Sequence, residues 1–192
     1  MILWDADGVL FDTFDAEGNF RWAATIEADL GISPACLHEI FHGRWEDVLR
    51  GLKHEEDHIA EVFEKHEVNT SPHIFMTYWL GRDNVVNPAL WTLLSPANGC
   101  IATNQGFART EMIDEIFAGK VREVYSSARL GVMKPEALYF AKIERKVARP
   151  VSTLCLIDDM PENVEAAQRR GWRGHVYTDV PSLLAFLKNQ KA

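Results

Sequence analysis

Cysteine is scarce in this chain. The 192 residues include three cysteines, Cys36, Cys100 and Cys155, and no two of them form a Cys-x-x-Cys pair. This small odd number excludes a disulfide framework. Cys100 and Cys155 lie in apolar runs, where cysteine packs as a small hydrophobic residue, and this use fits a reducing compartment.

Long apolar runs and a positively charged leader are also missing. The sequence has no run of 18 apolar residues, which excludes a membrane-spanning helix. An apolar run begins at Ile2, so no basic region of a signal peptide precedes it. We therefore expect a soluble cytoplasmic protein without a membrane partner.

Positive charge is the third deficit. The chain has 20 Lys and Arg residues against 28 Asp and Glu residues, and its formal net charge is −8. This balance argues against nucleic acid as a partner, because binding a phosphate backbone requires a basic surface. A small anionic substrate stays compatible, because one metal ion and one lysine reverse the charge locally. The length fits one large domain or a domain with an insertion.

The first twelve residues carry the most informative pattern. An apolar run over residues 2–4 is followed by Asp5, Asp7 and Gly8. Alternate residues of a strand point the same way, so both aspartates would share one side at the end of a buried strand. Two crowded carboxylates repel each other unless a divalent cation lies between them or one holds a proton. The pattern indicates a catalytic site; the alternative is a turn with two solvated acids.

Residues 13–87 have a helical pattern with clear start and stop signals. We predict a helix over residues 17–30 that ends at Gly31, and further helices that begin at Ser33-Pro34 and Ser71-Pro72. The region is rich in aromatic residues, most of which should form the core of a small helical bundle.

From Pro88 onward the pattern alternates between strand and helix. The predicted strands cover residues 100–103, 121–125, 153–157 and 175–177, and the predicted helices cover residues 88–94, 107–118, 135–146, 161–170 and 181–188. Such alternation implies a doubly wound parallel sheet, which binds ligands beyond the carboxyl ends of its strands. We predict an α/β fold with a Rossmann-like core (residues 1–12 and 88–192) and an inserted helical cap domain (residues 13–87).

Four polar segments fall at, or soon after, the carboxyl ends of predicted strands. They are Asp5-Ala6-Asp7-Gly8, Thr103-Asn104, Lys134 in Gly-Val-Met-Lys-Pro-Glu, and Asp158-Asp159 in Ile-Asp-Asp-Met-Pro-Glu-Asn. In this order they resemble the haloacid dehalogenase-like hydrolase superfamily, of the type with a helical cap inserted after the first strand. The match covers the whole predicted core and implies a phosphatase or a related hydrolase.

The residue types themselves fit phosphoryl transfer. Asp5 is placed to attack a phosphorus atom and form an aspartyl phosphate, which divides one displacement into two easier ones. A carboxylate and a phosphate dianion repel each other, and Mg²⁺, a hard ion with oxygen ligands, relieves this repulsion. Asp7 would protonate the leaving oxygen and later deprotonate water, which requires a carboxyl group of raised pKa.

The resemblance also implies a set of metal ligands. Mg²⁺ would bind the carboxylate of Asp5, the backbone carbonyl of Asp7 and a carboxylate of the Asp158-Asp159 pair. We favour Asp159 as the direct ligand and Asp158 as a water-bridged one, although the sequence leaves their order open.

Three further residues would bind the phosphoryl group. The Thr103 hydroxyl and the Asn104 backbone N–H would hold its oxygens, and Lys134 would supply a fixed positive charge. Asp7 favours phosphoryl transfer, to water or to a sugar, over cleavage of a carbon–halogen bond, because a halide leaves without a proton.

A competing metal motif lies in the inserted segment. Residues 38–42 and 54–58 both match His-Glu-x-x-His, the spacing of zinc proteases. Neither match is followed by a third ligand at a recognisable spacing, and the second lies among charged residues typical of a solvated helix face. A zinc hydrolase and a non-catalytic binding protein that use this histidine-rich segment remain alternatives of a different class.

We expect the inserted segment to act as a lid that excludes water and selects the substrate. His42, Arg44 and Trp45 flank a turn at Gly43 and are candidates for substrate contact. The sequence thus predicts a Mg²⁺-dependent phosphomonoesterase for a small phosphorylated metabolite such as a sugar phosphate. A phosphomutase is the alternative within the same chemistry, and the oligomeric state stays open.

Overall fold

A five-stranded sheet forms the centre of the fold in a computed structural model, which describes residues 1–189. Its strand order is β3-β2-β1-β4-β5, and all neighbouring strands run parallel. The strands are β1 (Ile2–Trp4), β2 (Gly99–Thr103), β3 (Val124–Ser126), β4 (Cys155–Asp158) and β5 (Arg173–Val176). Because the strands are parallel, their carboxyl ends meet at one edge of the sheet.

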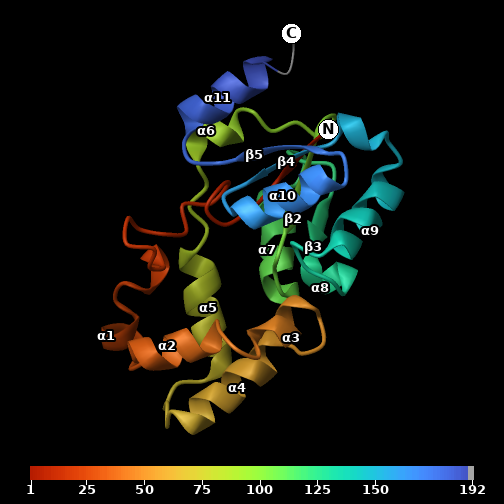
Figure 1. Cartoon of the computed structure of the whole chain (residues 1–192). Helices are drawn as coiled ribbons and strands as arrows, with labels where there is room; N and C mark the ends of the chain where they lie inside the picture. The colour runs from red at the N-terminus through yellow and green to blue at the C-terminus, as the bar shows by residue number, and fades with distance from the viewer. Residues whose placement is uncertain (190–192) are drawn as a thin grey trace.

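Helices cover both faces of this sheet (Figure 1). Leu3 and Trp4 are neighbours on β1 but point to opposite faces, so they belong to separate buried clusters. The cluster of Leu3 includes residues of α8 (Ser127–Leu130), α9 (Ala137–Val147) and α10 (Pro161–Arg169). The cluster of Trp4 includes residues of α6 (Pro88–Trp91), α7 (Phe107–Ile116) and α11 (Val180–Asn189). A short 3-10 helix, η2 (Val151–Thr153), precedes β4. The predicted doubly wound α/β fold is confirmed.

The region between β1 and α6 is helical. Residues 13–87, called the helical segment below, contain η1 (Arg21–Ala23), α1 (Ile26–Leu30), α2 (Pro34–Ile40), α3 (Trp45–Leu49), α4 (Glu55–Lys65) and α5 (Pro72–Arg82). Buried side chains of this segment, among them Trp22, Phe75 and Trp79, form a third cluster apart from the two at the sheet. A separate hydrophobic core supports the proposed division of the chain into a sheet domain and an inserted cap domain.

Local signals set several helix ends. Ser33 and Ser71 each accept a hydrogen bond from the backbone N–H three residues later, so the predicted starts of α2 and α5 are confirmed. The single helix predicted over residues 17–30 is wrong. The Asp15 carboxylate accepts hydrogen bonds from the backbone N–H groups two and four residues later. These bonds stabilise a turn instead of a helix, and only η1 and α1 are helical in this range.

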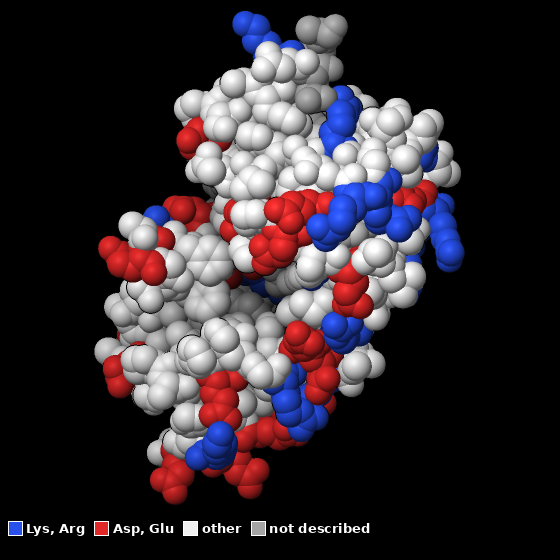
Figure 2. Space-filling model, in the orientation of Figure 1, with Lys and Arg blue, Asp and Glu red and all other residues white. Residues whose placement is uncertain are grey.

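Two connecting segments, around residues 10–12 and 85–87, join the helical segment to the sheet domain and pair with each other. The Asp12 N–H donates to the Val85 carbonyl at 2.9 Å, and the Asn87 N–H donates to the Leu10 carbonyl at 2.8 Å. The helical segment lies beyond the carboxyl ends of the strands (Figure 1), and the molecular surface is hollowed between the two parts (Figure 2). This hollow borders the edge of the sheet where a ligand is expected.

Cys36, Cys100 and Cys155 are all buried free thiols, as the absence of a disulfide framework predicts. Among residues 1–189, no helix has the length and apolar character that crossing a membrane requires.

Candidate active site

Asp5 directly follows β1, and its side chain is buried. The Asp5 N–H donates to the Ile157 carbonyl at 2.8 Å, which continues the pairing of β1 with β4. One carboxylate oxygen accepts a hydrogen bond from the Ala6 N–H at 2.7 Å, and the other lies 2.9 Å from Nζ of Lys134. Burial, and then repulsion by Asp158, raises the pKa of Asp5 well above its ordinary value. The carboxylate is thus held in one position at the end of the strand.

Lys134 joins two carboxylates at this edge. Its side chain is 1% exposed, and Nζ lies 2.9 Å from Asp5 Oδ2 and 2.6 Å from Asp158 Oδ2. Burial alone would lower the pKa of Lys134, but these two carboxylates raise it, so the ammonium is charged. The Asn104 side chain fixes the Lys134 backbone, because its Nδ2 donates to the carbonyl and its Oδ1 accepts from the N–H, both at 2.9 Å.

Asp158 and Asp159 have different environments. Asp158 is fully buried, and its Oδ1 accepts hydrogen bonds from the Met160 N–H and from Asn163 Nδ2, while its Oδ2 faces the lysine. Asp159 is half-buried, and burial followed by the charge of Asp158 raises its pKa to about 6. A Cβ atom on Gly8 would lie 2.4 Å from Asp159 Oδ2, so glycine leaves the room that this carboxylate occupies.

Three carboxylates converge next to Lys134. Asp5, Asp158 and Asp159 each offer an oxygen atom within 4.8 Å of the others, and in residues 1–189 no second group of three or more His, Cys, Asp or Glu side chains does so. Buried carboxylates that raise each other's pKa are stabilised by a hard divalent cation, and oxygen is the ligand that Mg²⁺ prefers. The donor set therefore fits Mg²⁺. Both oxygens of Asp158 already have partners, which favours Asp159 as the direct ligand.

The Asp7 side chain has a different set of partners. Its Oδ1 lies 2.8 Å from Nη2 of Arg109 and accepts a hydrogen bond from the Thr13 hydroxyl at 3.2 Å, and its Oδ2 accepts one from Gln105 Nε2 at 2.7 Å. Burial alone would raise the pKa of Asp7, but Arg109 and the other donors lower it. The expected raised pKa is therefore wrong for this arrangement, because a buried guanidinium stabilises the charged carboxylate.

Thr103 is the last residue of β2, and Asn104 begins the loop that follows the strand. The Thr103 hydroxyl is buried, and Gln105 Nε2 approaches it at 3.5 Å. The loop is fixed against α8, because the Gln105 N–H donates to Ser127 Oγ at 3.0 Å and the Ala128 N–H donates to the Gln105 carbonyl at 3.2 Å. The parallel register of β1 and β2 brings this loop beside the end of β1.

Gln105 and Arg109 bind the Asp7 carboxylate but were not predicted from the sequence. The Arg109 side chain is 0% exposed and lies one helical turn before the buried Ile113 on α7. A charged residue on the buried stripe of a helix requires a charged or polar partner. A basic residue on the buried face of α7 is therefore the signal that could have identified Arg109. The sequence does not show that its partner is Asp7.

The three candidates for substrate contact have other partners. Trp45 is buried in the aromatic core of the helical segment, and Arg44 pairs with acidic side chains of the same segment. His42 is exposed, and its ring stacks on that of His38 with 3.8 Å between the centroids. Within residues 1–189, no hydrogen bond, ion pair or ring contact joins any of these three side chains to Asp5.

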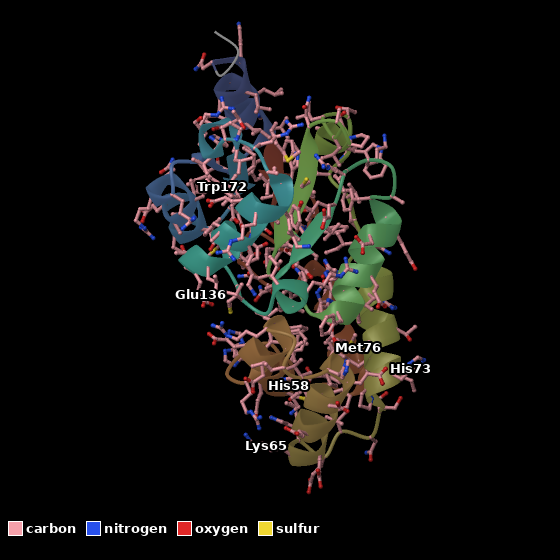
Figure 3. All side chains as sticks on the ribbon, turned by 90° about the vertical axis from the view of Figure 1, so that its right-hand side faces the viewer. His58, Lys65, His73, Met76, Glu136 and Trp172 are labelled. Carbon is pink, nitrogen blue, oxygen red and sulfur yellow. The ribbon has the colours of Figure 1, made fainter. Side chains whose placement is uncertain are left out.

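Other side chains of the helical segment reach the sheet domain instead. Arg50, which follows α3, pairs with Glu136 at 2.7 Å. Glu136 lies at the end of the sheet domain that faces the helical segment, opposite the end where Trp172 lies (Figure 3). The backbone N–H of Ala108, in the first turn of α7, donates to Glu55 Oε1 at 2.7 Å. These contacts tie α3 and α4 to the sheet domain.

The two His-Glu-x-x-His motifs do not form zinc sites in the described residues. In the second motif, His58 is buried and its Nε2 donates to the Ile40 carbonyl at 2.9 Å, while Glu55 is engaged at α7. In the first motif, Glu39 pairs with two basic side chains near the end of α4, and the two histidine rings stack on each other. Both glutamates thus have structural partners, and neither histidine pair has a third ligand in residues 1–189.

Several solved structures have a similar fold. A haloacid dehalogenase family enzyme from Bacteroides thetaiotaomicron, in complex with magnesium and inorganic phosphate, has a TM-score of 0.79 at 18% identity, with 95% of this chain and 97% of that chain covered. A predicted haloacid dehalogenase-like hydrolase from Porphyromonas gingivalis has a TM-score of 0.75 at 19% identity, with 97% and 96% covered. L-2-haloacid dehalogenase from Xanthobacter autotrophicus has a TM-score of 0.63 at 13% identity, with 90% and 75% covered.

Similarity at the level of sequence is more limited. No protein family model matches the chain. Drimenol cyclase from Aspergillus calidoustus is 23% identical over an alignment of 171 residues that covers 82% of this chain. The chain spans 32% of the length of that relative, so the match aligns it with one part of a longer protein.

Proposed function

We propose that this chain, which has the fold of the haloacid dehalogenase-like enzymes, is a Mg²⁺-dependent phosphomonoesterase for small phosphorylated metabolites such as sugar phosphates. The observation that carries the proposal is the buried contact of Asp5 with Lys134, beside the carboxylates of Asp158 and Asp159. This arrangement combines a fixed nucleophile, a fixed positive charge and an oxygen donor set for a hard cation. Bound magnesium and phosphate in the similar Bacteroides thetaiotaomicron enzyme support the same chemistry.

Asp5 is the proposed nucleophile. In the first step one of its oxygens attacks phosphorus, and the bond from phosphorus to the leaving oxygen breaks as the aspartyl phosphate forms. The Lys134 ammonium, the Thr103 hydroxyl and the Asn104 backbone N–H hold the phosphoryl oxygens and stabilise their developing charge. Mg²⁺, when bound by Asp5, Asp159 and the backbone carbonyl of Asp7, offsets the negative charge of the phosphate.

Asp7 is the proposed acid and base. It gives its proton to the leaving oxygen in the first step and accepts a proton from water in the second. That water attacks phosphorus, the bond to Asp5 breaks, and phosphate leaves. The proton that Asp7 takes from water in the second step is the one it gives to the leaving oxygen in the next turnover, and Arg109 stabilises the ionised form that activates water. A carboxyl group in this role also favours phosphoryl transfer over carbon–halogen cleavage, since a halide leaves without a proton.

We propose that the helical segment acts as the cap of this site. It lies beyond the carboxyl ends of the strands (Figure 1), and Arg50 and Glu55 tie it to Glu136 and to α7 of the sheet domain. A cover of this kind limits access to small substrates and excludes water from the reacting groups.

Replacing Asp5 with asparagine tests the proposal. Asn cannot form the phosphoryl intermediate, so hydrolysis of p-nitrophenyl phosphate in the presence of Mg²⁺ should be lost. Asp12→Asn is a matched control, because Asp12 lies on the same chain segment but is exposed and pairs with Arg21. Activity that survives Asp5→Asn, or that needs no divalent cation, would contradict the proposed function. Activity that survives Asp5→Asn but disappears when His38 and His42 are replaced would favour a zinc hydrolase.

A further inference from the structure

Helix α7 contacts the helical segment at two places, α4 and the end of α5. Near its start, the Ala108 N–H donates to Glu55 Oε1 from α4. One residue later, Arg109 contacts Asp83, which directly follows α5 and begins the return to the sheet domain. Helix α7 therefore connects the helical segment to the loop of residues 104–106, which lies between β2 and α7.

Arg109 has an unusual environment for a basic residue. Its Nη2 lies 2.8 Å from Asp7 Oδ1 and 2.9 Å from Asp83 Oδ2, and its Nη1 donates to the Asp83 carbonyl at 2.5 Å. The rings of Phe11 and Trp79 lie 5.0 Å and 5.8 Å from its guanidinium carbon. The guanidinium is thus desolvated, packed between aromatic rings and shared by two carboxylates.

We propose that Arg109 is a positioning residue for Asp7, which it holds in place by an anchor on Asp83 at the end of α5. The inference rests on the proposed function, in which Asp7 is the acid and base. It assigns to Arg109 no contact with substrate and no step of proton transfer.

The contacts explain why arginine occupies this position. A planar guanidinium presents several N–H groups in fixed directions and reaches two carboxylates at once, whereas a lysine ammonium is a single point of charge. Thr13 and Gln105 also donate to Asp7, but Arg109 is its cationic partner and reaches the carboxylate from the side of α5. Without Arg109, the Asp7 carboxylate keeps two neutral donors, Thr13 and Gln105, and loses its connection to Asp83 after α5.

A test follows from the chemistry of the leaving group. Nitrophenolate leaves with little help from an acid, whereas an alkoxide such as that of a sugar phosphate requires a proton. Misplacing Asp7 should therefore slow hydrolysis of an alkyl phosphomonoester much more than hydrolysis of p-nitrophenyl phosphate. A general loss of structure would slow both substrates by the same factor.

The experiment compares three variants. The double variant Arg109→Met with Asp83→Asn removes the bridge without leaving Asp83 as an unpaired buried carboxylate. We expect its kcat to fall at least tenfold more on glycerol phosphate than on p-nitrophenyl phosphate, with KM changed by less than about threefold. Asp83→Asn alone keeps an oxygen for Arg109 and should change the ratio of the two kcat values by less than about threefold. Glu55→Gln, which alters the other contact on α7, is expected to leave that ratio unchanged.

Carboxyl ¹³C NMR of aspartate-labelled protein gives a readout that does not depend on activity. The Asp7 resonance, assigned with Asp7→Asn, should shift in the double variant and stay near its wild-type value in Glu55→Gln. Equal losses on both substrates, or an Asp7 resonance that the double variant leaves in place, would overturn the role of Arg109. An inactive wild-type protein would contradict the proposed phosphatase, and the NMR comparison would still decide whether Arg109 positions Asp7.

Discussion

Replacing Lys134 with methionine removes the cation that lies between two buried carboxylates. Lys134 Nζ is 2.9 Å from Asp5 and 2.6 Å from Asp158, and its side chain is 1% exposed. Breaking a buried ion pair by removal of one partner costs about 3–5 kcal/mol. For a chain of this length that corresponds to a decrease of about 6–20 °C in the Tm. Such a loss is a large part of the roughly 5–15 kcal/mol that stabilises a typical native protein.

Thermal and urea unfolding followed by circular dichroism, first with EDTA and then with Mg²⁺, measure this loss. Mg²⁺ should restore part of the stability of Lys134→Met, because the same carboxylates attract a divalent cation. Lys146→Met is the matched control, since Lys146 is 52% exposed and lies 3.8 Å from Glu123. A surface pair of this kind contributes at most about 1 kcal/mol. A loss below about 1 kcal/mol for Lys134→Met in EDTA would refute the reasoning that the two carboxylates depend on this lysine.

Two other predictions concern single side chains. Gly8→Ala should lower the free energy of unfolding by about 1–3 kcal/mol and weaken Mg²⁺ binding, measured by calorimetry, because the new Cβ would lie 2.4 Å from Asp159 Oδ2 at a φ of +72°. Gly18→Ala is its control, with a φ of +83° and open space around the new atom, and an equal effect of both on Mg²⁺ binding would contradict the steric argument. Burial lowers the pKa of His58 below its ordinary value of about 6.5, so the unfolded chain takes up a proton that the folded chain resists. The free energy of unfolding should therefore fall as the pH decreases below about 6.5, and it should fall less in His58→Gln. Identical pH profiles for the two proteins would argue against a lowered pKa of His58.

The residues proposed at the nucleophile and the cation site could be identified from the sequence. Asp5, Thr103 and Asp158 each end or follow a short apolar run, and parallel strands bring such positions to one edge of a sheet. The identity of the strands depends on local alternation and apolar content, which the sequence displays directly. Lys134 could be identified because it follows β3 closely along the chain, which places it near the same edge of the sheet.

The turn at Asp15 and the partners of Asp7 could not be identified in this way. The helix predicted from residue 17 includes Gly18 and Asn19, which favour a turn, and the Asp15 carboxylate binds the N–H groups of residues 17 and 19. Likewise, the spacing of Asp5 and Asp7 indicates a shared side of the strand, whereas the Asp7 carboxylate binds Arg109, which is 102 residues away.

The sequence by itself thus determined the parallel sheet, the position of the inserted helices and the acidic cluster at the strand ends, because short apolar runs, helix-start residues and the alternation of strand and helix encode these features locally. Only the tertiary structure decided that Arg109 lies between Asp7 and Asp83, and that the pKa of Asp7 is lowered instead of raised. Charge interactions of this strength arise over a few ångströms in a desolvated interior. Which groups pair depends on how the end of α5 lies against α7, and no periodic pattern in the sequence predicts that contact.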